Sequence, residues 1–178
     1  MHDLQAARGA TIATQRSHRG LLAAGIGVAG FAADWATKEW ALRSLADSAP
    51  VELIPGTLYL RLIRNPGAAF SMGENLTVAL TCLAIAALGF LLIWMLPRAR
   101  HTGWAVATGL LIAGVAGNLL DRLTREPAPF HGHVIDFLQV PWFAVFNVAD
   151  IWITCAAVLV VWLTVVRQVD LGGERVGG

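Results

Sequence analysis

The sequence predicts an all-α membrane protein with four transmembrane helices and a small extracytoplasmic β-sheet. Hydrophobic residues make up 56% of the 178 residues, and the mean hydropathy is +0.61. Only 14% of the residues are charged, whereas a soluble domain carries about 25%. Four apolar stretches approach the roughly 20 residues that a membrane-spanning helix needs. The formal net charge of +1 provides no basic surface, so we expect no nucleic-acid partner.

The first apolar stretch, residues 21–33, is short and permits two interpretations. It follows several basic residues and ends in small residues, which is also the layout of a cleavable signal peptide. Alternatively, it is a retained helix that continues through Asp34 to Trp40 and so reaches membrane-spanning length. That helix would place Asp34 and Lys38 one turn apart on the same face. We favour the retained helix.

Three further spans are predicted over residues 76–96, 104–120 and 150–166, because these stretches are almost free of charged residues. The third span also carries small residues at every fourth position, which lets another helix approach closely. These residues are Ala105, Gly109, Ala113 and Gly117. We interpret them as a helix-packing surface.

The segment of about 41–75 lies between the first two spans and is not itself a span. Leucines alternate with other residues over 58–63, which is typical of a half-buried strand. A turn is predicted at Asn65-Pro66-Gly67. We therefore expect a small sheet that rests on the bilayer surface. The glycine-rich tail from Leu171 is expected to be disordered.

The flanking charges predict the orientation. The connection 97–103 contains basic residues and no acid, and basic residues favour the cytoplasmic side. With four spans, both termini then lie in the cytoplasm. This gives a cytoplasmic tail over residues 1–19, a membrane domain over 20–166 and a second cytoplasmic tail over 167–178.

No metal or disulfide site is expected. Cys82 and Cys155 lie inside apolar runs without ligand-like spacing, so we interpret them as small buried side chains. His131, His133 and Asp136 could bind a metal, but no His-Glu-x-x-His motif of a zinc protease is present. We expect no cofactor.

Ionisable groups at membrane depth are costly and are usually functional or paired. Here polar and ionisable residues gather at or beyond the outer ends of the spans, and the acids among them outnumber the bases by four to two. The set comprises Asp34, Lys38, Asn118, Asp121, Arg122, Asp136, Asn147 and Asp150.

Several of these residues also have simple local explanations. Asp34 and Lys38 could be an ion pair that ends a helix. Asn147 could cap the fourth helix, with Asp150 at its third position. These explanations leave the gathering of so many polar groups at one end of an apolar protein unexplained.

Two carboxyl groups at this end of the bundle could perform general acid–base catalysis. Held close together in a low-dielectric site, they do not both ionise easily, so one keeps a proton. The ionised one can then take a proton from water while the protonated one polarises a carbonyl group. The spacing alone does not say which acids form the pair, since Asp121 could pair with Arg122 and Asp136 could merely end a loop.

Five motifs, taken together and in order, resemble the lipoprotein signal peptidase (signal peptidase II) family over about residues 20–166. They are Asp34-x-x-x-Lys38, Asn65-Pro-Gly-Ala-Ala-Phe70, Gly117-Asn-x-x-Asp-Arg122, His133-Val-Ile-Asp-Phe137 and Phe146-Asn-Val-Ala-Asp150. The resemblance implies an aspartic endopeptidase of the bacterial inner membrane. Such an enzyme removes the signal peptide of a prolipoprotein just before a cysteine that carries diacylglycerol.

The resemblance also implies roles for residues. It places the catalytic pair on Asp136 and Asp150. Supporting or substrate-binding roles fall on Asp34, Lys38, Asn65, Gly67, Asn118, Asp121, Arg122, Asn147 and Ala149. The implied partners are prolipoproteins with a lipidated cysteine, membrane lipid and inhibitors of the globomycin type, and we expect a monomer with its site near the extracytoplasmic face.

Two other classes of protein remain as alternatives. A small transporter or proton-conducting protein would use the acids as a relay, and would need polar groups through the membrane thickness. A non-catalytic membrane scaffold would use them only to hold the fold.

Overall fold

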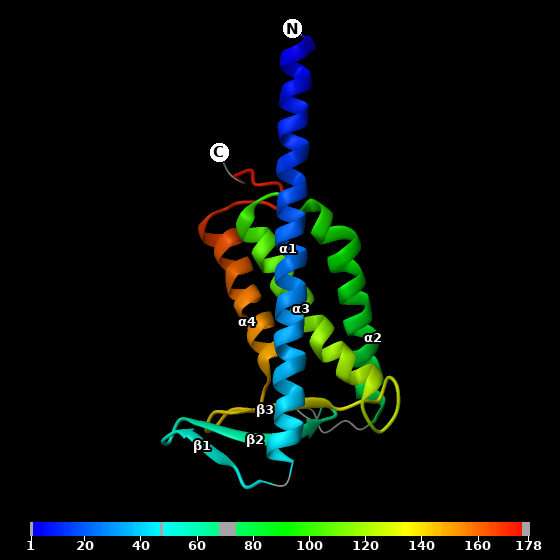
Figure 1. Ribbon diagram of the computed structural model, residues 1–178, viewed down its shortest axis with the longest axis vertical. Coiled ribbons are helices and arrows are strands. Elements are labelled where there is room, and N and C mark those ends of the chain that lie inside the picture. The colour runs from blue at the N-terminus through cyan, green and yellow to red at the C-terminus, as the bar shows by residue number, and fades with distance from the viewer. Residues whose placement is uncertain (1, 47, 68–73, 176–178) are drawn as a thin grey trace.

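Four long helices form a bundle that stands on a small antiparallel sheet (Figure 1). The computed structural model of the protein describes residues 2–46, 48–67 and 74–175. Within these ranges the sheet closes one end of the bundle, and the described ends of the chain lie at the opposite end. The predicted fold class, a helical membrane protein with a small sheet, is confirmed.

Each long helix contains a segment that is long and apolar enough to cross a membrane. The helices are α1 (His2–Leu45), α2 (Glu74–Phe90), α3 (Thr102–Thr124) and α4 (Val148–Val161). Helix α2 continues through a π-helical turn and a 3-10 turn to Arg98, and α4 continues through a π-helical turn to Val166. The four candidate spans are His18–Leu45, Leu76–Arg98, Thr102–Thr124 and Val148–Val166. Helix α1 is unbroken through residues 21–40, as the retained-helix interpretation requires.

Helix α3 is the centre of the bundle. Half of its span is buried (50%), against 17–22% for the other three spans. The predicted small-residue surface explains why, since Ala105 and Ala113 are fully buried and Gly109 packs on α1. A Cβ atom on Gly109 would lie only 2.6 Å from the carbonyl oxygen of Ala23. Small side chains on α3 therefore bring α1 close to it.

The sheet has the strand order β1 (Val51–Ile54), β2 (Leu58–Asn65), β3 (Val134–Gln139), and both pairings are antiparallel. The predicted strand around 58–63 is thus confirmed as part of β2. On this strand Leu60 is buried, and it packs with Leu45 of α1 and Phe137 of β3. The sheet is therefore attached to the last turns of α1.

Two features of this region differ from the sequence prediction. Helix α1 continues to Leu45, so the segment that was expected to be β from about residue 41 begins as helix. The loop interpretation of Asp136 is wrong, because this residue lies within β3. The four residues from Val134 to Phe137 are all buried, so the strand lacks the alternation by which a half-exposed strand is recognised.

The expectation of a disordered tail from Leu171 is wrong for the described residues up to Arg175. The backbone N–H of Arg100 donates to the carbonyl oxygen of Leu171 at 2.9 Å. The indole Nε1 of Trp104 donates to the carbonyl oxygen of Val169, also at 2.9 Å. These hydrogen bonds satisfy buried polar groups and hold the tail against the end of the bundle.

The expectation that Cys82 and Cys155 are buried is also wrong. Both are free and exposed in the chain. They lie on α2 and α4, whose spans are only 17% buried, so most side chains of these helices face outward. Apolar side chains on the outside of such a thin bundle are solvated by lipid rather than by protein.

The close contact at Gly109 leads to a prediction for packing. We expect Gly109→Ala to destabilise the protein by about 1–3 kcal/mol, because the new methyl group pushes α1 away from α3. Gly25→Ala is the matched control on α1, since a Cβ there meets nothing within 4 Å. Thermal unfolding in detergent should show a lower midpoint only for Gly109→Ala. An unchanged midpoint for that variant would contradict the packing argument.

Candidate active site

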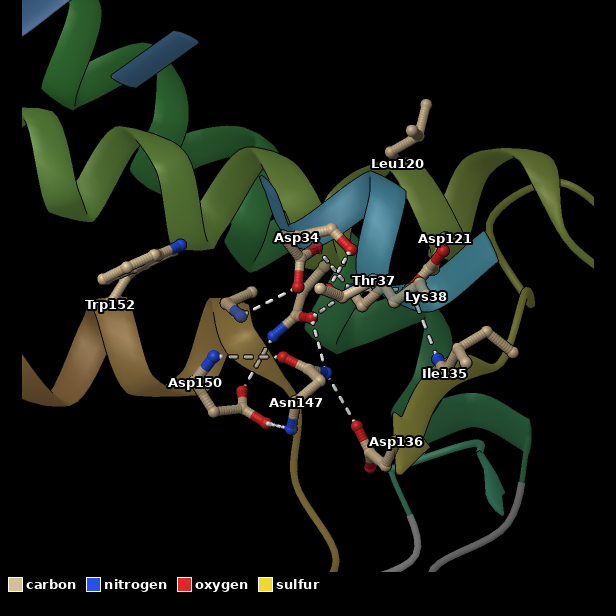
Figure 2. A network of polar contacts seen from close by, with 12 residues as sticks. Asp34, Thr37, Lys38, Leu120, Asp121, Ile135, Asp136, Asn147, Asp150 and Trp152 are labelled. Carbon is tan, nitrogen blue, oxygen red and sulfur yellow. Dashed lines mark hydrogen bonds and ion pairs between the residues drawn. The ribbon is translucent and has the colours of Figure 1, made fainter. Parts of the chain in front are cut away.

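The sheet end of the bundle gathers almost all of the polar residues singled out in the sequence (Figure 2). Helix α1 contributes Asp34 and Lys38, the end of β2 contributes Asn65, α3 contributes Asn118, Asp121 and Arg122, β3 contributes Asp136, and the start of α4 contributes Asn147, Ala149 and Asp150. Segments far apart in the sequence therefore meet at one place.

The ammonium group of Lys38 lies inside this cluster. Its side chain is 1% exposed, and its Nζ is 2.8 Å from Asp34 Oδ2 and 2.8 Å from Asp121 Oδ2. It also donates to Asn118 Oδ1 at 3.0 Å. The predicted one-turn pairing of Asp34 with Lys38 is confirmed, but it is buried and not an exposed pair at a helix end. A buried charge of this kind needs several good partners, and Lys38 has three.

Asp121 does not pair with Arg122, its neighbour in the sequence. Its Oδ1 instead accepts from Nε of Arg125, one helical turn further on, and its Oδ2 also accepts from the backbone N–H of Ile135 at 3.3 Å. Arg125 in turn donates to Glu39 Oε1 of α1 at 2.9 Å. Sequence reasoning missed Arg125 and Glu39, although the i,i+4 spacing of Asp121 and Arg125 was a usable signal.

Asp34 connects α1 to the start of α4. Its Oδ1 accepts from the backbone N–H of Ala149 at 2.8 Å, an otherwise unpaired donor in the first turn of the helix. A side chain on Gly117 of α3 would collide with the Asp34 carboxylate. The absence of a side chain at Gly117 therefore makes room for Asp34.

Asn147 begins α4 and lies between Asp136 and Asp150 (Figure 2). The predicted cap is confirmed as a capping box. The side-chain Oδ1 of Asn147 accepts from the backbone N–H of Asp150 at 3.0 Å. The backbone N–H of Asn147 donates to Asp150 Oδ2 at 3.1 Å. The Nδ2 of Asn147 donates to Asp136 Oδ1 at 2.7 Å. One residue thus donates to both carboxyl groups, with its side-chain amide to Asp136 and with its backbone N–H to Asp150.

Two further amides complete the contacts of these acids. Asn118 Nδ2 donates to Asp150 Oδ1 at 2.9 Å, and Asn65 Nδ2 donates to Asp136 Oδ2 at 2.8 Å. Each of the two carboxyl groups therefore accepts an N–H on both of its oxygens. Such contacts fix the orientation of a carboxyl group.

Asp136 is 2% exposed, and its environment changes its acidity. Burial, together with the nearby negative charge of Asp150, raises the pKa of Asp136 to about 6, although the Asn65 and Asn147 hydrogen bonds and the charge of Lys38 act to lower it. At mildly acidic pH this carboxyl group therefore keeps a proton that an ordinary aspartate would have released.

Both acids line one cavity of about 520 Å³. One wall is polar and includes Asn65, Asp136 and Asp150. The other wall is mostly apolar and consists of Phe143, Ala144, Val145, Phe146, Ile151, Thr154 and Cys155. The cavity can therefore place an apolar guest directly beside two carboxyl groups.

The predicted turn after β2 is present. Gly67 has a φ of 101°, and its N–H donates to Asn65 Oδ1 at 2.8 Å. Thr77 of α2 donates to the carbonyl oxygen of Pro66 at 2.6 Å and so holds the turn. The rest of that sequence motif, Ala68 to Phe70, lies outside the described residues.

The three residues considered as metal ligands do not come together. His133 lines a separate cavity of about 290 Å³ with Arg64 and Arg125, whereas Asp136 faces the larger cavity. Among residues 2–46, 48–67 and 74–175, no group of three or more His, Cys, Asp or Glu side chains could hold a metal ion.

Arg122 lies near the acids without an ion pair to any described residue. Its charge interacts over a longer range with Asp136, Asp121 and Asp150. Its Nη1 is buried and has no hydrogen-bond partner in the part of the chain that the structure describes. Leaving a buried guanidinium N–H without an acceptor costs free energy.

The sequence profile of the family described as signal peptidase (SPase) II matches residues 26–166. A lipoprotein signal peptidase of Leifsonia xyli is 43% identical over 143 residues, which cover 80% of this chain and 65% of that protein. One of Rhodococcus jostii is 43% identical over 147 residues, covering 82% and 73%. This chain thus spans about two thirds of the length of these relatives.

The fold is also found among solved structures. Two structures described as bacterial membrane enzymes superpose with TM-scores of 0.68 and 0.71, each at 26% identity. The matches cover 82% and 80% of this chain and 88% and 92% of theirs.

The fold and site together define a multi-pass membrane protein with two acids in one cavity at the end of a four-helix bundle. The profile match covers most of the chain, and the relatives share over two fifths of the aligned residues. The chain belongs to the signal peptidase II family.

The raised pKa of Asp136 predicts a pH-dependent stability. The pKa is about 6 in the folded protein, against 3.8 for an ordinary aspartate side chain. Between about pH 4 and 6 the folded state keeps a proton that the unfolded state releases, so the free energy of unfolding falls as the pH rises. With one pKa unit worth about 1.4 kcal/mol, the loss should be roughly 3 kcal/mol.

Thermal unfolding in detergent at several pH values measures this loss. Asp136→Asn is the control, and it should lack the decrease between pH 4 and 6. A wild-type unfolding midpoint that rises over this pH range relative to Asp136→Asn would contradict the prediction.

Proposed function

We propose that this chain is an intramembrane aspartic endopeptidase that removes the signal peptide from diacylglyceryl-modified prolipoproteins, with cleavage just before the lipidated cysteine. The observation that carries the proposal is the bridging of Asp136 and Asp150 by Asn147 at the wall of one cavity. The relatives from Leifsonia and Rhodococcus are named lipoprotein signal peptidases, which supports the same substrate class.

In the proposed mechanism, one carboxyl group is ionised and the other is protonated. Asp136 holds the proton and donates it to the carbonyl oxygen of the scissile peptide bond, because burial raises its pKa to about 6. A bound substrate would exclude more water and raise that pKa further. Asp150 takes a proton from the attacking water as the general base.

The cavity suits a lipid-modified peptide. Its apolar wall would face the acyl chains and the apolar signal peptide, while its polar wall meets the scissile bond. Arg122 does not line the cavity, and it would support the site through the interaction of its charge with Asp136 and Asp150. Asn65, Gly67, Asn118, Asp121 and Ala149 hold the polar wall in place through the contacts described above.

We further propose that the protein acts as a monomer in the bacterial inner membrane, needs no metal or cofactor and is inhibited by globomycin-type peptides. The sheet end of the bundle faces the extracytoplasmic side, and tails 1–19 and 167–178 lie in the cytoplasm. Membrane domain 20–166 carries the site. This orientation places the acids beside the outer leaflet, where water and a laterally arriving substrate can both reach them.

A proton relay across the membrane is a weaker proposal. Residues 20–33, 76–97, 102–117 and 151–166 contain no Asp, Glu, Lys, Arg or His. The buried ionisable side chains of the described residues, Asp34, Lys38, Asp121 and Asp136, are gathered at the sheet end of the bundle. A transporter or proton-conducting protein needs polar groups through the full thickness of the membrane.

We predict that Asp136→Asn and Asp150→Asn each lower the cleavage rate by about 10²–10⁴-fold, because each removes a proton donor or acceptor. The double variant should be little slower than either single variant, since the two acids act as one unit. Purified protein in detergent, mixed with a diacylglyceryl-modified prolipoprotein, gives the rate of signal-peptide release. The pH profile of the wild type should be bell-shaped.

Asp121→Asn is the contrasting variant, because Asp121 contacts Lys38 and Arg125 and does not line the cavity. It should lower stability or substrate affinity more than turnover. Since Asp150 also stabilises the start of α4, unfolding is measured beside activity for every variant. A folded Asp136→Asn protein that cleaves at the wild-type rate would exclude Asp136 from the mechanism.

A topology prediction follows from the proposed orientation. Reporter fusions at Arg100, in the basic connection between α2 and α3, and at Ala46, after α1, should report opposite sides of the membrane. Arg100 should be cytoplasmic. The same side for both fusions would reject a four-span arrangement.

A further inference from the structure

We propose that Lys38 is a positioning residue whose ammonium group sets the direction of the hydrogen bonds that run through Asn118 and Asn147 to both acids of the site. The inference rests on the proposed function. It differs from a substrate-binding role, because Lys38 is 1% exposed and does not line the cavity of Asp136 and Asp150.

The donors of Lys38 are all used inside the protein. An ammonium group has three N–H donors and no acceptor. The Nζ atom lies 2.8 Å from Asp34 Oδ2, 2.8 Å from Asp121 Oδ2 and 3.0 Å from Asn118 Oδ1. The first two partners neutralise its charge, and the third is the start of a path toward the acids.

This contact fixes the amide of Asn118. Because Lys38 can only donate, the oxygen of Asn118 must face it, and the amide nitrogen must then point away. That nitrogen donates to Asp150 Oδ1 at 2.9 Å. A flipped amide would place its NH₂ group against the ammonium and its oxygen against the oxygen of Asp150.

The same oxygen fixes Asn147. Asn118 Oδ1 also accepts from Asn147 Nδ2 at 3.1 Å, and Asn147 Nδ2 uses its other hydrogen on Asp136 Oδ1 at 2.7 Å. The Oδ1 of Asn147 meanwhile accepts from Asp150 N. One donor-only group therefore determines that both acids receive N–H donors, which leaves their remaining lone pairs for water and substrate.

Other charged groups surround this path and bear on its test. Asp34 and Lys38 face it from α1, Asp121, Arg122 and Arg125 from α3, Asp136 from β3 and Asp150 from α4. A variant of Lys38 thus removes a charge as well as a donor. The experiment must separate the two effects.

A double-mutant cycle makes this separation. Lys38→Met should lower kcat by about 100-fold, as a small misplacement of reacting groups does, and should leave KM within about threefold. Asn118→Leu removes both ends of the amide. If Lys38 acts through Asn118, then Lys38→Met should have little further effect in the Asn118→Leu background. An equal loss of kcat in both backgrounds would overturn the proposal.

The matched control is Arg43→Met. It removes a cation from the same helix. Arg43 is 80% exposed, lies outside the site and forms only a long ion pair, with 3.9 Å between its Nη2 and Glu39 Oε2. Activity and stability should stay unchanged. A loss of kcat equal to that of Lys38→Met would mean that any cation removed from α1 has this effect, and would overturn the proposal.

Asn118→Asp keeps the test decisive if Lys38→Met does not fold. It preserves the oxygen that Lys38 contacts and the side-chain volume, and replaces the NH₂ group that faces Asp150 by an oxygen of an ionisable carboxyl group. Two oxygens then face each other and need an extra proton, so kcat should fall and the acid limb of the pH profile should move to higher pH. Wild-type kcat and an unmoved acid limb would overturn the proposal.

An infrared titration without substrate distinguishes this proposal from the proposed function. The band of the protonated Asp136 carboxyl group is assigned by its absence in Asp136→Asn. Its titration midpoint should shift in Lys38→Met, and the shift should be less than half as large when Asn118→Leu is already present. Equal shifts would overturn the role of Lys38. Unequal shifts in these variants, together with a wild-type protein that cleaves no prolipoprotein, would refute only the proposed function.

Discussion

The burial of one ammonium group inside an apolar bundle is the constraint on which the rest of the structure depends. Lys38 is fully buried, and an unpaired charge there would cost several kcal/mol. Its partners come from α1 and α3, so these two helices must lie close enough for their side chains to form ion pairs and hydrogen bonds. The glycines of α3, which allow that approach, therefore serve the polar site as well as the packing.

The cost of burying polar groups also explains why the cluster lies at the end of the spans. Carboxylates and amides can be held at this depth because the sheet and the start of α4 supply backbone donors, such as the N–H groups of Ile135 and Ala149. The apolar remainder of each span has no ionisable group and can lie in lipid. The fold thus separates a part whose apolar side chains contact lipid from a part whose polar groups form hydrogen bonds with one another.

Local patterns in the sequence were enough to predict the four spans, the contact of Asp34 with Lys38 and the cap formed by Asn147. Each depends on hydropathy or on residues within one helical turn. Contacts between distant segments could not be derived in this way. Arg122 was considered as a partner of Asp121, whereas the ion pair is formed with Arg125, and β3 was missed because its buried residues do not alternate. The choice of Asp136 rested on resemblance, since only the fold brings it to Asn147.

The shared cap at the start of α4 has a consequence for how the protein is made. The two acids receive their hydrogen bonds from the end of β2, from α3 and from the cap itself, and the cap residues come last in the chain. A nascent chain that has inserted only three helices has neither the second acid nor the amide that bridges the pair. The proposed hydrolytic activity therefore requires the final helix, and it can begin only once all four helices are in the membrane.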